Sequence, residues 1–303
     1  MRTYKNKKRC CKKHKRIRKS YSQNIKKGGS IKTIDNVAFL IPMHPKHYDM
    51  NYSLLNKLKN IMVTIDIYGI FSNKQDYELF KMKEMIKEII PDNIPTDTNA
   101  IVIYKKLYGL KCMINTPYEY VILCDSEIDI VPENFTKENI ITKIQDIFNN
   151  KVIYGIKVIR EIARRTIRVC ASVFAGDDYK KIESATDNFT LFSFWYNLPV
   201  YKREHLKDFL DKIKFDTLTI TWDHFESLLY EYYLITNHNF KMIDITNMAN
   251  NIGDGLYVEN INRFSRLKEL KFGFSSVLYK FWKLMPNELS KEKTFLLIHT
   301  NRE

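Results

Sequence analysis

Two short, uninterrupted apolar runs constrain the fold of this chain more than any other feature. The first covers residues 37–41 and is closed by Pro42, and the second covers residues 120–124. A strand that is apolar at every position is buried on both faces, as in a parallel sheet covered by helices. The sequence therefore predicts an α/β fold, with further strands expected over 61–71 and 100–104.

Helical signals lie between and after these runs. Ser72 and Gln75 form a capping-box pattern, which predicts a helix that continues with apolar periodicity to Pro91. Later elements are expected as helices near 107–114, 203–213, 222–235 and 274–285, strands over 152–158, 169–174 and 294–299, and a polar loop over 176–188. This order predicts a mostly parallel central sheet with helices on both faces, followed by a smaller extension.

The positive charge is concentrated at the start of the chain. The net charge is +14, and residues 1–30 contain thirteen Lys and Arg but no acidic residue. The remainder has 36 basic and 35 acidic residues and is almost neutral. We therefore predict a disordered basic tail over 1–33 and a single α/β domain over 34–303. The tail is a solvated arm, a contact through residues 1–30 for polyanions such as nucleic acid, an anionic membrane or a virion interior, or both.

Cysteine spacing and hydropathy indicate the compartment. The five Cys show no CxxC spacing, which argues against a disulfide framework or a zinc cluster and favours a reducing environment. No apolar stretch follows the basic start, and the run over 37–43 is too short to cross a bilayer. We expect no signal peptide, no transmembrane segment and a cytoplasmic protein.

Acidic residues follow the second apolar run at alternate positions: Asp125, Glu127 and Asp129. Alternation along an extended chain places them on one side, at the strand end where open α/β sheets bind ligands. Carboxylates packed together need a cation or protons to compensate their charge, and oxygen ligands suit Mn²⁺ or Mg²⁺. We predict that Asp125 and Glu127 bind such an ion. The alternative is an exposed turn whose acids cap the next segment.

This segment resembles the glycosyltransferase A-type fold, whose Asp-X-Asp signature follows a buried strand. Asp125-Ser126-Glu127 matches the signature, with Glu in the second acidic place, and the resemblance covers residues 37–134. It implies a Rossmann-like sheet, a nucleotide-sugar donor, a glycan or protein acceptor, and an ion that stabilises the departing diphosphate. The Lys-, Asn-, Ile- and Tyr-rich composition is also similar to glycosyltransferases encoded by large DNA viruses, which implies the host cytoplasm or the virion.

The resemblance also implies where the donor binds. His44 follows the first strand, Ser72 follows the second, and Lys105, Lys106 and Lys111 flank the helix before the acidic strand. His44 and Ser72 would contact the nucleoside or ribose, and a lysine the diphosphate. The ordinary alternatives are a loop histidine, a helix cap at Ser72 and lysines on an exposed helix face.

An inverting transfer needs a general base, and Asp223 and Glu226 are the candidates. The same spacing is also a capping pattern at a helix start, so both interpretations stay open. Two other functions remain. A nucleotidyltransferase would use the same acids, and a non-catalytic nucleic-acid-binding or virion-associated protein would use the tail. There is no Gly-rich P-loop to support ATP or GTP hydrolysis.

Overall fold

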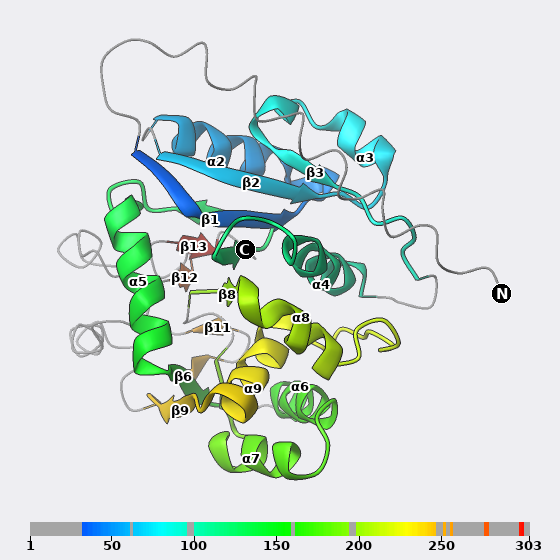
Figure 1. Cartoon of the computed structure of the whole chain (residues 1–303), viewed down its shortest axis with the longest axis vertical. Coiled ribbons are helices and arrows are strands. Elements are labelled where there is room, and N and C mark those ends of the chain that lie inside the picture. The colour runs from blue at the N-terminus through cyan, green and yellow to red at the C-terminus, as the bar shows by residue number, and fades with distance from the viewer. Residues whose placement is uncertain are drawn as a thin grey trace.

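The computed structural model describes residues 32–60, 63–95, 100–158, 161–193, 198–246, 251–252, 255–256, 276–278 and 297–299. Its central sheet has the strand order β3-β2-β1-β4-β8 (Figure 1). The bounds are β1 Lys32–Pro42, β2 Val63–Ile70, β3 Lys87–Ile89, β4 Tyr120–Leu123 and β8 Val200–Lys202. The first four strands are parallel, and β8 is antiparallel to β4. The predicted α/β fold with a mostly parallel central sheet is confirmed.

Strand β1 is buried on both faces, as its apolar run predicts. Ala38 and Leu40 pack with helix α4 (Ile101–Met113), whereas Phe39 and Ile41 belong to the core that includes helix α2 (Tyr48–Asn60). The two helices lie on opposite sides of the sheet (Figure 1). Gly109 lets α4 approach closely, because a Cβ there would lie only 2.4 Å from Cδ1 of Ile70.

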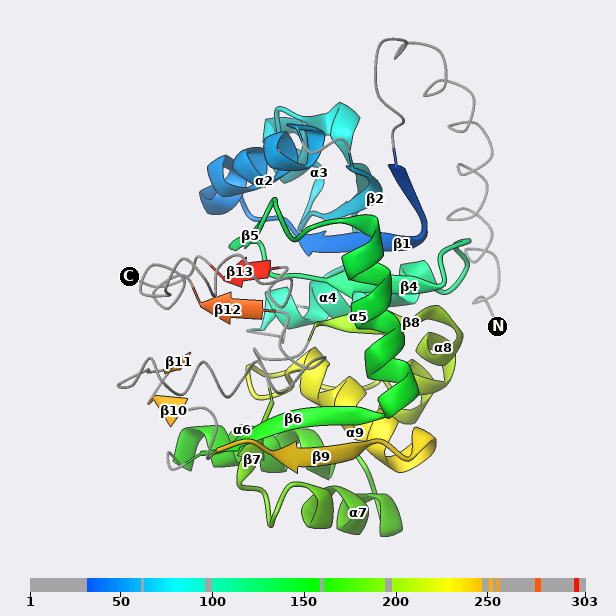
Figure 2. The same cartoon turned by 90° about the vertical axis from the view of Figure 1, so that its left-hand side faces the viewer.

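A second layer of structure follows the acidic motif. Helix α5 (Lys137–Asn150) extends from the central sheet to a smaller sheet of order β7-β6-β9 (Figure 2). That sheet contains β6 Val152–Lys157, β7 Leu191–Phe192 and β9 Lys241–Asp244. The helices near it are α6 Glu161–Ser172, α7 Asp177–Ala185 and α9 Glu226–His238, whereas α8 Arg203–Lys212 packs against α4 and β8 of the central sheet and against α9. This layer lies where the sequence predicts an extension, but it is not smaller than the part of the described chain before it.

The remaining elements are short. Helix α3 covers Lys74–Leu79, and the 3-10 helices η4 and η5 cover Pro45–His47 and Lys83–Met85. Strand β5 (Ile128–Ile130) joins β13 (Leu297–His299) and β12 (Ser276–Leu278) in a third sheet, and β10 (Asn251–Ile252) pairs with β11 (Gly255–Leu256). Because β5 belongs to a different sheet from β4, the acidic motif lies at a junction between two sheets.

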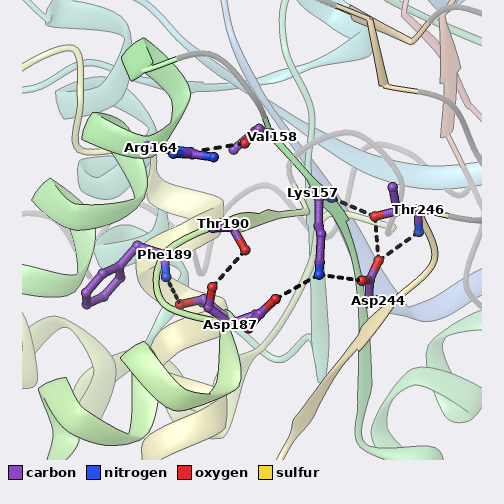
Figure 3. A network of polar contacts seen from close by, with 9 residues as sticks. Lys157, Val158, Arg164, Asp187, Phe189, Thr190, Asp244 and Thr246 are labelled. Atoms are coloured by element: carbon purple, nitrogen blue, oxygen red, sulfur yellow. Dashed lines mark hydrogen bonds and ion pairs between the residues drawn. The ribbon is translucent and has the colours of Figure 1, made fainter.

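Lys157 contacts segments that flank both of the other strands of the smaller sheet (Figure 3). Its Nζ lies 2.9 Å from Oδ2 of Asp187 and 3.7 Å from Oδ2 of Asp244. Its backbone N–H donates to Oγ1 of Thr246 at 2.8 Å. One side chain at the end of β6 thus holds both the segment before β7 and the end of β9.

Three consecutive residues before β7 have left-handed backbone conformations. Asp187, Asn188 and Phe189 have φ values of 48°, 54° and 62°. None is glycine, so each carries a steric cost of roughly 1–2 kcal/mol. Surrounding bonds hold the turn: the Phe189 N–H donates to Oγ1 of Thr186 at 3.2 Å, and Oγ1 of Thr190 donates to the Asp187 carbonyl at 2.7 Å (Figure 3).

The predicted long helix from Ser72 to Pro91 is wrong. The helix ends at Leu79 and is followed by η5 and strand β3. Ile89 and Ile90 pack into opposite cores, which is the alternation of a strand, and β3 pairs with β2. Pairing with the sheet edge therefore overrides the helical spacing of the isoleucines.

Three other local predictions are wrong. Residues 101–104 start helix α4 instead of forming a strand. The segment 169–172 is the end of α6, where Ile167, Cys170 and Ala171 are buried on one helix face. The expected loop over 176–188 contains helix α7, which buries Ile182.

Of the other predicted elements, some are confirmed, one begins later than predicted, and some lie mostly outside the described residues. Strands β4, β6 and β13 and helix α8 lie where they were expected, whereas α9 begins four residues after Trp222, at Glu226. Most of the tail lies outside the described residues. So does most of the predicted helix over 274–285, but its described part, Ser276–Leu278, is strand β12, because it pairs with β13; the helix prediction is wrong there. Among the residues described, no helix combines the length and apolar character needed to span a membrane.

Candidate functional site

The candidate site forms where three parallel strands end side by side. His44, Ser72 and Asp125 each lie two residues after β1, β2 and β4, respectively. Two backbone bonds extend the ladder beyond the strands: Met43 N–H donates to the Ile70 carbonyl at 2.8 Å, and Cys124 N–H to the Leu40 carbonyl at 3.0 Å. The three side chains therefore start from one edge of the sheet.

Lys105 lies beneath the ends of β1 and β2. Its Nζ donates to the Met43 carbonyl at 2.6 Å and to Oγ of Ser72 at 3.3 Å, and the residue is 3% exposed. Burial lowers the pKa of this amine to about 8, against a smaller opposing effect of the Asp76 carboxylate. No carboxylate forms an ion pair with Lys105 in the described part of the chain. The structure thus brings together Lys105 and Ser72, two residues that the sequence analysis names as candidates for a donor site.

Ser72 is not the cap of helix α3. The N-cap is Asn73, whose Oδ1 accepts from the Asp76 N–H at 2.8 Å. The hydroxyl of Ser72 points instead to the Lys105 amine. The ordinary interpretation of Ser72 as a capping residue is therefore wrong.

The loop after β1 is joined to the acidic turn through His47. Its Nε2 lies 3.1 Å from Oε1 of Glu127, and its Nδ1 lies 2.5 Å from Oγ of Ser126. Nδ2 of Asn51 donates to the Ser126 carbonyl at 2.8 Å. His44 is exposed next to this loop, and its pKa is lowered by burial and then by the nearby charges of His47 and Lys105.

Lys106 connects two carboxylates from distant parts of the sequence. Its Nζ lies 2.5 Å from Oδ1 of Asp125 and 2.8 Å from Oε1 of Glu226, the first residue of α9. The side chains of Lys106 and Glu226 are 6% and 4% exposed, whereas that of Asp125 is 25% exposed. Burial alone would lower the pKa of Lys106, but the two carboxylates outweigh burial and raise it. The amine therefore stays protonated between them.

The three acidic side chains of the motif turn to three different partners. Asp125 pairs with Lys106, Glu127 with His47, and Asp129 with Lys57 of α2. Residues 126–127 form a turn, so the extended alternation expected from the sequence is interrupted. In the structure, two lysines and one histidine therefore contact the acidic motif in which the sequence predicts a metal site.

A divalent ion has a limited set of ligands here. Within the described ranges, no group of three or more His, Cys, Asp or Glu side chains could hold a metal ion. Asp125 and Glu127 nevertheless provide oxygen ligands of the type that Mn²⁺ or Mg²⁺ accepts, and their side chains are 25% and 21% exposed. An ion at this turn would have to complete its coordination with ligand phosphates and water.

The structure separates the two candidate bases. Glu226 joins the carboxylate cluster, whereas Asp223 lies against α6: its Oδ2 is 2.7 Å from Nη2 of Arg165, and its Oδ1 accepts from Oγ1 of Thr166 at 3.0 Å. The N-cap of α9 is Phe225, without a side-chain capping bond, so the predicted capping pattern does not form.

Lys111 lies further along α4, paired with Asp216 on the surface. Its Nζ lies over the ring of Phe215, 5.6 Å from the centroid. This position is the exposed-face alternative that the sequence left open. Lys111 is thus apart from the group formed by Lys105, Ser72 and His44.

Sequence reasoning missed the role of Lys106, which it treated only as a possible diphosphate contact. A signal existed: Ile103, Lys106 and Leu110 share one helix face, and the two apolar residues predict that this face is buried. Tyr201 was also missed as a polar neighbour. Its hydroxyl is buried without a hydrogen-bond partner among the described residues, and its pKa is raised by burial and then by Glu226.

Comparison with solved structures gives a distant likeness. The crystal structure of mannose-1-phosphate geranyltransferase from Thermus thermophilus matches with a TM-score of 0.31 and 8% sequence identity, over 70% of each chain. No protein-family model matches this chain, and no curated protein does. Likeness at this level carries no argument about activity, so the resemblance to glycosyltransferases stays a prediction.

Proposed function

We propose that this chain is a transferase that binds a nucleoside-diphosphate sugar at the carboxyl edge of its central sheet and transfers the sugar to a hydroxyl acceptor. The observation that carries the proposal is Lys105, a buried amine without a carboxylate partner in the described part of the chain. Open α/β sheets bind their ligands at this edge. A buried cation there is stabilised by an anionic ligand, because the ligand supplies the missing counter-charge.

The neighbours of Lys105 suit a nucleotide diphosphate. Ser72 presents a hydroxyl beside the amine, and His44 and Lys46 are exposed in the loop after β1. Imidazole rings stack with bases or donate to phosphates, and a lysine attracts phosphate charge. We assign the diphosphate to Lys105 and the nucleoside to the loop around His44.

Asp125 and Glu127 are the residues that would hold Mn²⁺ or Mg²⁺ beside the donor. When bound, such an ion stabilises the charge that develops on the leaving diphosphate. Lys106 neutralises part of the charge of Asp125 in the structure, so weak ion binding without nucleotide is expected. The ion is therefore expected to bind appreciably only together with the donor, in a ternary complex.

Glu226 is the proposed general base, because it is the candidate that joins the cluster around Asp125. Its Oε1 is held by Lys106, and its Oε2 is a buried atom without a hydrogen-bond partner among the described residues. For Oε2 to take the proton of an acceptor hydroxyl, acceptor binding has to expose this oxygen. Asp223 is engaged by Arg165 and Thr166, and we assign it to the packing of α6 against the segment before α9.

The decisive experiment measures nucleotide binding by thermal shift and calorimetry, with and without Mn²⁺. A panel of nucleoside diphosphates and their sugar conjugates should raise the melting temperature, because only ligands that prefer the folded state do so. Lys105→Met should weaken binding by about tenfold or more, corresponding to loss of one charge-assisted contact. Lys111→Met is the matched control on the same helix and should bind as the wild type does.

The outcomes separate the competing functions. Equal affinity of Lys105→Met and wild type contradicts the proposed donor site. Release of free sugar from a bound donor supports a transferase, whereas release of sugar phosphate supports a nucleotidyltransferase. Absence of all nucleotide binding, together with salt-sensitive DNA or RNA binding that is lost on removal of residues 1–30, supports the non-catalytic alternative.

A further inference from the structure

Trp222 is an exposed aromatic residue on a turn that is held in place on both sides. The residue is 55% exposed. Nδ1 of His224 accepts the Thr221 N–H at 3.0 Å, and the His224 N–H donates to the Thr221 carbonyl at 3.1 Å. Asp223 is fixed to helix α6 by the two side-chain contacts described above. A single exposed apolar side chain needs no functional explanation, so the neighbours of this indole decide whether it has a role.

A pocket lies next to this turn, between the start of α4 and the segment before Trp222. Its volume is about 190 Å³, and it is lined by Pro95, Tyr104 and residues 216–220. Two residues of fully extended chain span at most about 7 Å, so the backbone of Trp222 lies within that distance of Ile220 in the pocket wall. The pocket and the indole are therefore neighbouring parts of one surface.

The pocket wall formed by residues 216–220 is polar at alternate positions. Thr217 and Thr219 are exposed, whereas Leu218 is half-buried and Ile220 is buried. This alternation is that of an extended chain, which places the two hydroxyls on the same side. The side chain of Asp216 is 76% exposed at the start of the wall. The pocket thus combines an aromatic ring, two hydroxyls and a carboxylate.

This combination of groups suits a sugar. A pyranose ring has an apolar C–H face that packs on an aromatic ring, and a rim of hydroxyls that exchange hydrogen bonds with hydroxyl and carboxylate groups. A polyanion fits less well, because Asp216 and its partner Lys111 leave no excess positive charge on the wall. A protein partner also fits less well, since threonine is under-represented among the residues that dominate protein interfaces.

The pocket adjoins the proposed donor site through helix α4. Tyr104 lines the pocket, and the next residue, Lys105, donates to Ser72 and to the Met43 carbonyl. The Cα atoms of consecutive residues are about 3.8 Å apart. A ligand in the pocket is therefore held beside the place that we assign to the donor diphosphate.

We propose that the pocket and Trp222 form the acceptor site, and that the acceptor is a saccharide of at least two sugar units. One ring stacks on the indole of Trp222. The neighbouring ring enters the pocket, where Thr217, Thr219 and Asp216 bind its hydroxyls. The role as acceptor rests on the proposed function, whereas saccharide binding itself rests only on these side chains.

The experiment is saturation-transfer NMR on the full chain, a method that detects weak ligands. The probes are the methyl glycosides and the disaccharides of glucose, galactose, mannose and N-acetylglucosamine, each measured with and without nucleoside diphosphates and Mn²⁺. We expect at least one disaccharide to bind, more tightly than its methyl glycoside, with saturation strongest on the C–H protons of one ring face. The same disaccharide should change the tryptophan fluorescence of the wild type but not that of Trp222→Phe.

Four variants test the individual contacts. Trp222→Ala should weaken disaccharide binding by roughly three- to tenfold, because the stacking surface is lost, whereas Trp222→Phe keeps an aromatic face and should stay within about threefold. Thr219→Val keeps the shape, removes one hydroxyl and should weaken binding by about threefold or more. Ile243→Ala shortens another exposed apolar residue, 42% exposed on β9, and is the matched control that should bind as the wild type does. All four should have the urea midpoint of the wild type.

The outcomes separate this proposal from the proposed function. Absence of saturation on every probe in both conditions overturns the saccharide site, and so does a disaccharide signal that is equal in Trp222→Ala and wild type. Weaker nucleotide binding in Trp222→Ala, with unchanged disaccharide binding, assigns the indole to the donor and also contradicts the proposal. Disaccharide binding without any nucleotide binding supports the saccharide site and contradicts the transferase. Nucleotide binding without disaccharide binding supports the transferase and contradicts a sugar acceptor.

Discussion

Glu231 offers a direct test of how burial controls stability in this fold. It lies in α9, is 9% exposed, and its carboxylate accepts a hydrogen bond from Oγ of Ser193. Burial raises its pKa from 4.5 to about 8, and the bond from Ser193 opposes only part of that shift. The native protein therefore holds a proton on Glu231 at pH 7 that the unfolded chain releases.

The sign of the effect follows from proton linkage. A carboxyl group whose pKa is higher in the native state favours the unfolded chain as the pH rises from the lower value to the higher one. The interval from 4.5 to about 8 corresponds to at most about 5 kcal/mol, of which about 3 kcal/mol is lost by pH 7. Glu231→Gln keeps the shape and removes the titration. We expect the variant to be more stable than the wild type at pH 7 to 8. The difference in free energy of unfolding should be smallest near pH 5.

Urea unfolding measured at half-unit steps from pH 5 to pH 8 tests this expectation. Glu133→Gln, at an exposed position, is the matched control for the loss of one carboxyl group. An advantage of Glu231→Gln that stays constant across this range, or a loss of stability at pH 8, would refute the reasoning. Either result would mean that Glu231 is ionised in the native protein.

Two further predictions concern packing and a histidine pair. The rings of His205 and His238 stack with centroids 3.9 Å apart, and burial followed by the charge of His238 lowers the pKa of His205 from 6.5 to about 4. The free energy of unfolding should therefore fall by at most about 3 kcal/mol as the pH drops from about 6.5 to about 4. In His205→Gln, the melting temperature should depend less on pH over that interval. A melting temperature that falls with pH as steeply as in the wild type would contradict this pKa. Gly109→Ala should destabilise the protein by about 1–3 kcal/mol in urea unfolding, because the new methyl group would meet Ile70 and Leu40; a variant as stable as wild type would show that α4 can move away from the sheet without cost.

The sequence predicts the strands that are apolar at every position. β1 and β4 lie where their runs place them, because a run of this length is too short for a buried helix and suits a strand that is buried on both faces. For segments with apolar residues on one face only, the sequence does not decide between a helix and a strand as readily. The stretch that forms α3, η5 and β3 carries isoleucines at spacings compatible with either period, and only pairing with β2 decides the outcome.

The sequence predicts which residues lie at the candidate site but not which side chains they contact there. His44, Ser72 and Asp125 follow strand ends, and the sequence therefore places them at one edge. The partners of the acidic residues come from α2, α4 and the loop after β1, and only tertiary packing brings these elements to the motif. The contacts of Lys106, His47 and Lys57 with these acidic residues therefore lie beyond what the residue pattern alone predicts.

Lys105 and Lys106 are neighbours in the chain, yet their amines contact different parts of the candidate site. Successive residues on an α-helix project about 100° apart, so a single turn of backbone presents one amine to the ends of β1 and β2 and the next to Asp125 and Glu226. A one-residue insertion or deletion earlier in α4 would rotate both amines away from their partners at once. A rotation of α4 as a rigid rod would therefore break the contacts of Lys105 with the ends of β1 and β2 and those of Lys106 with Asp125 and Glu226 in the same movement.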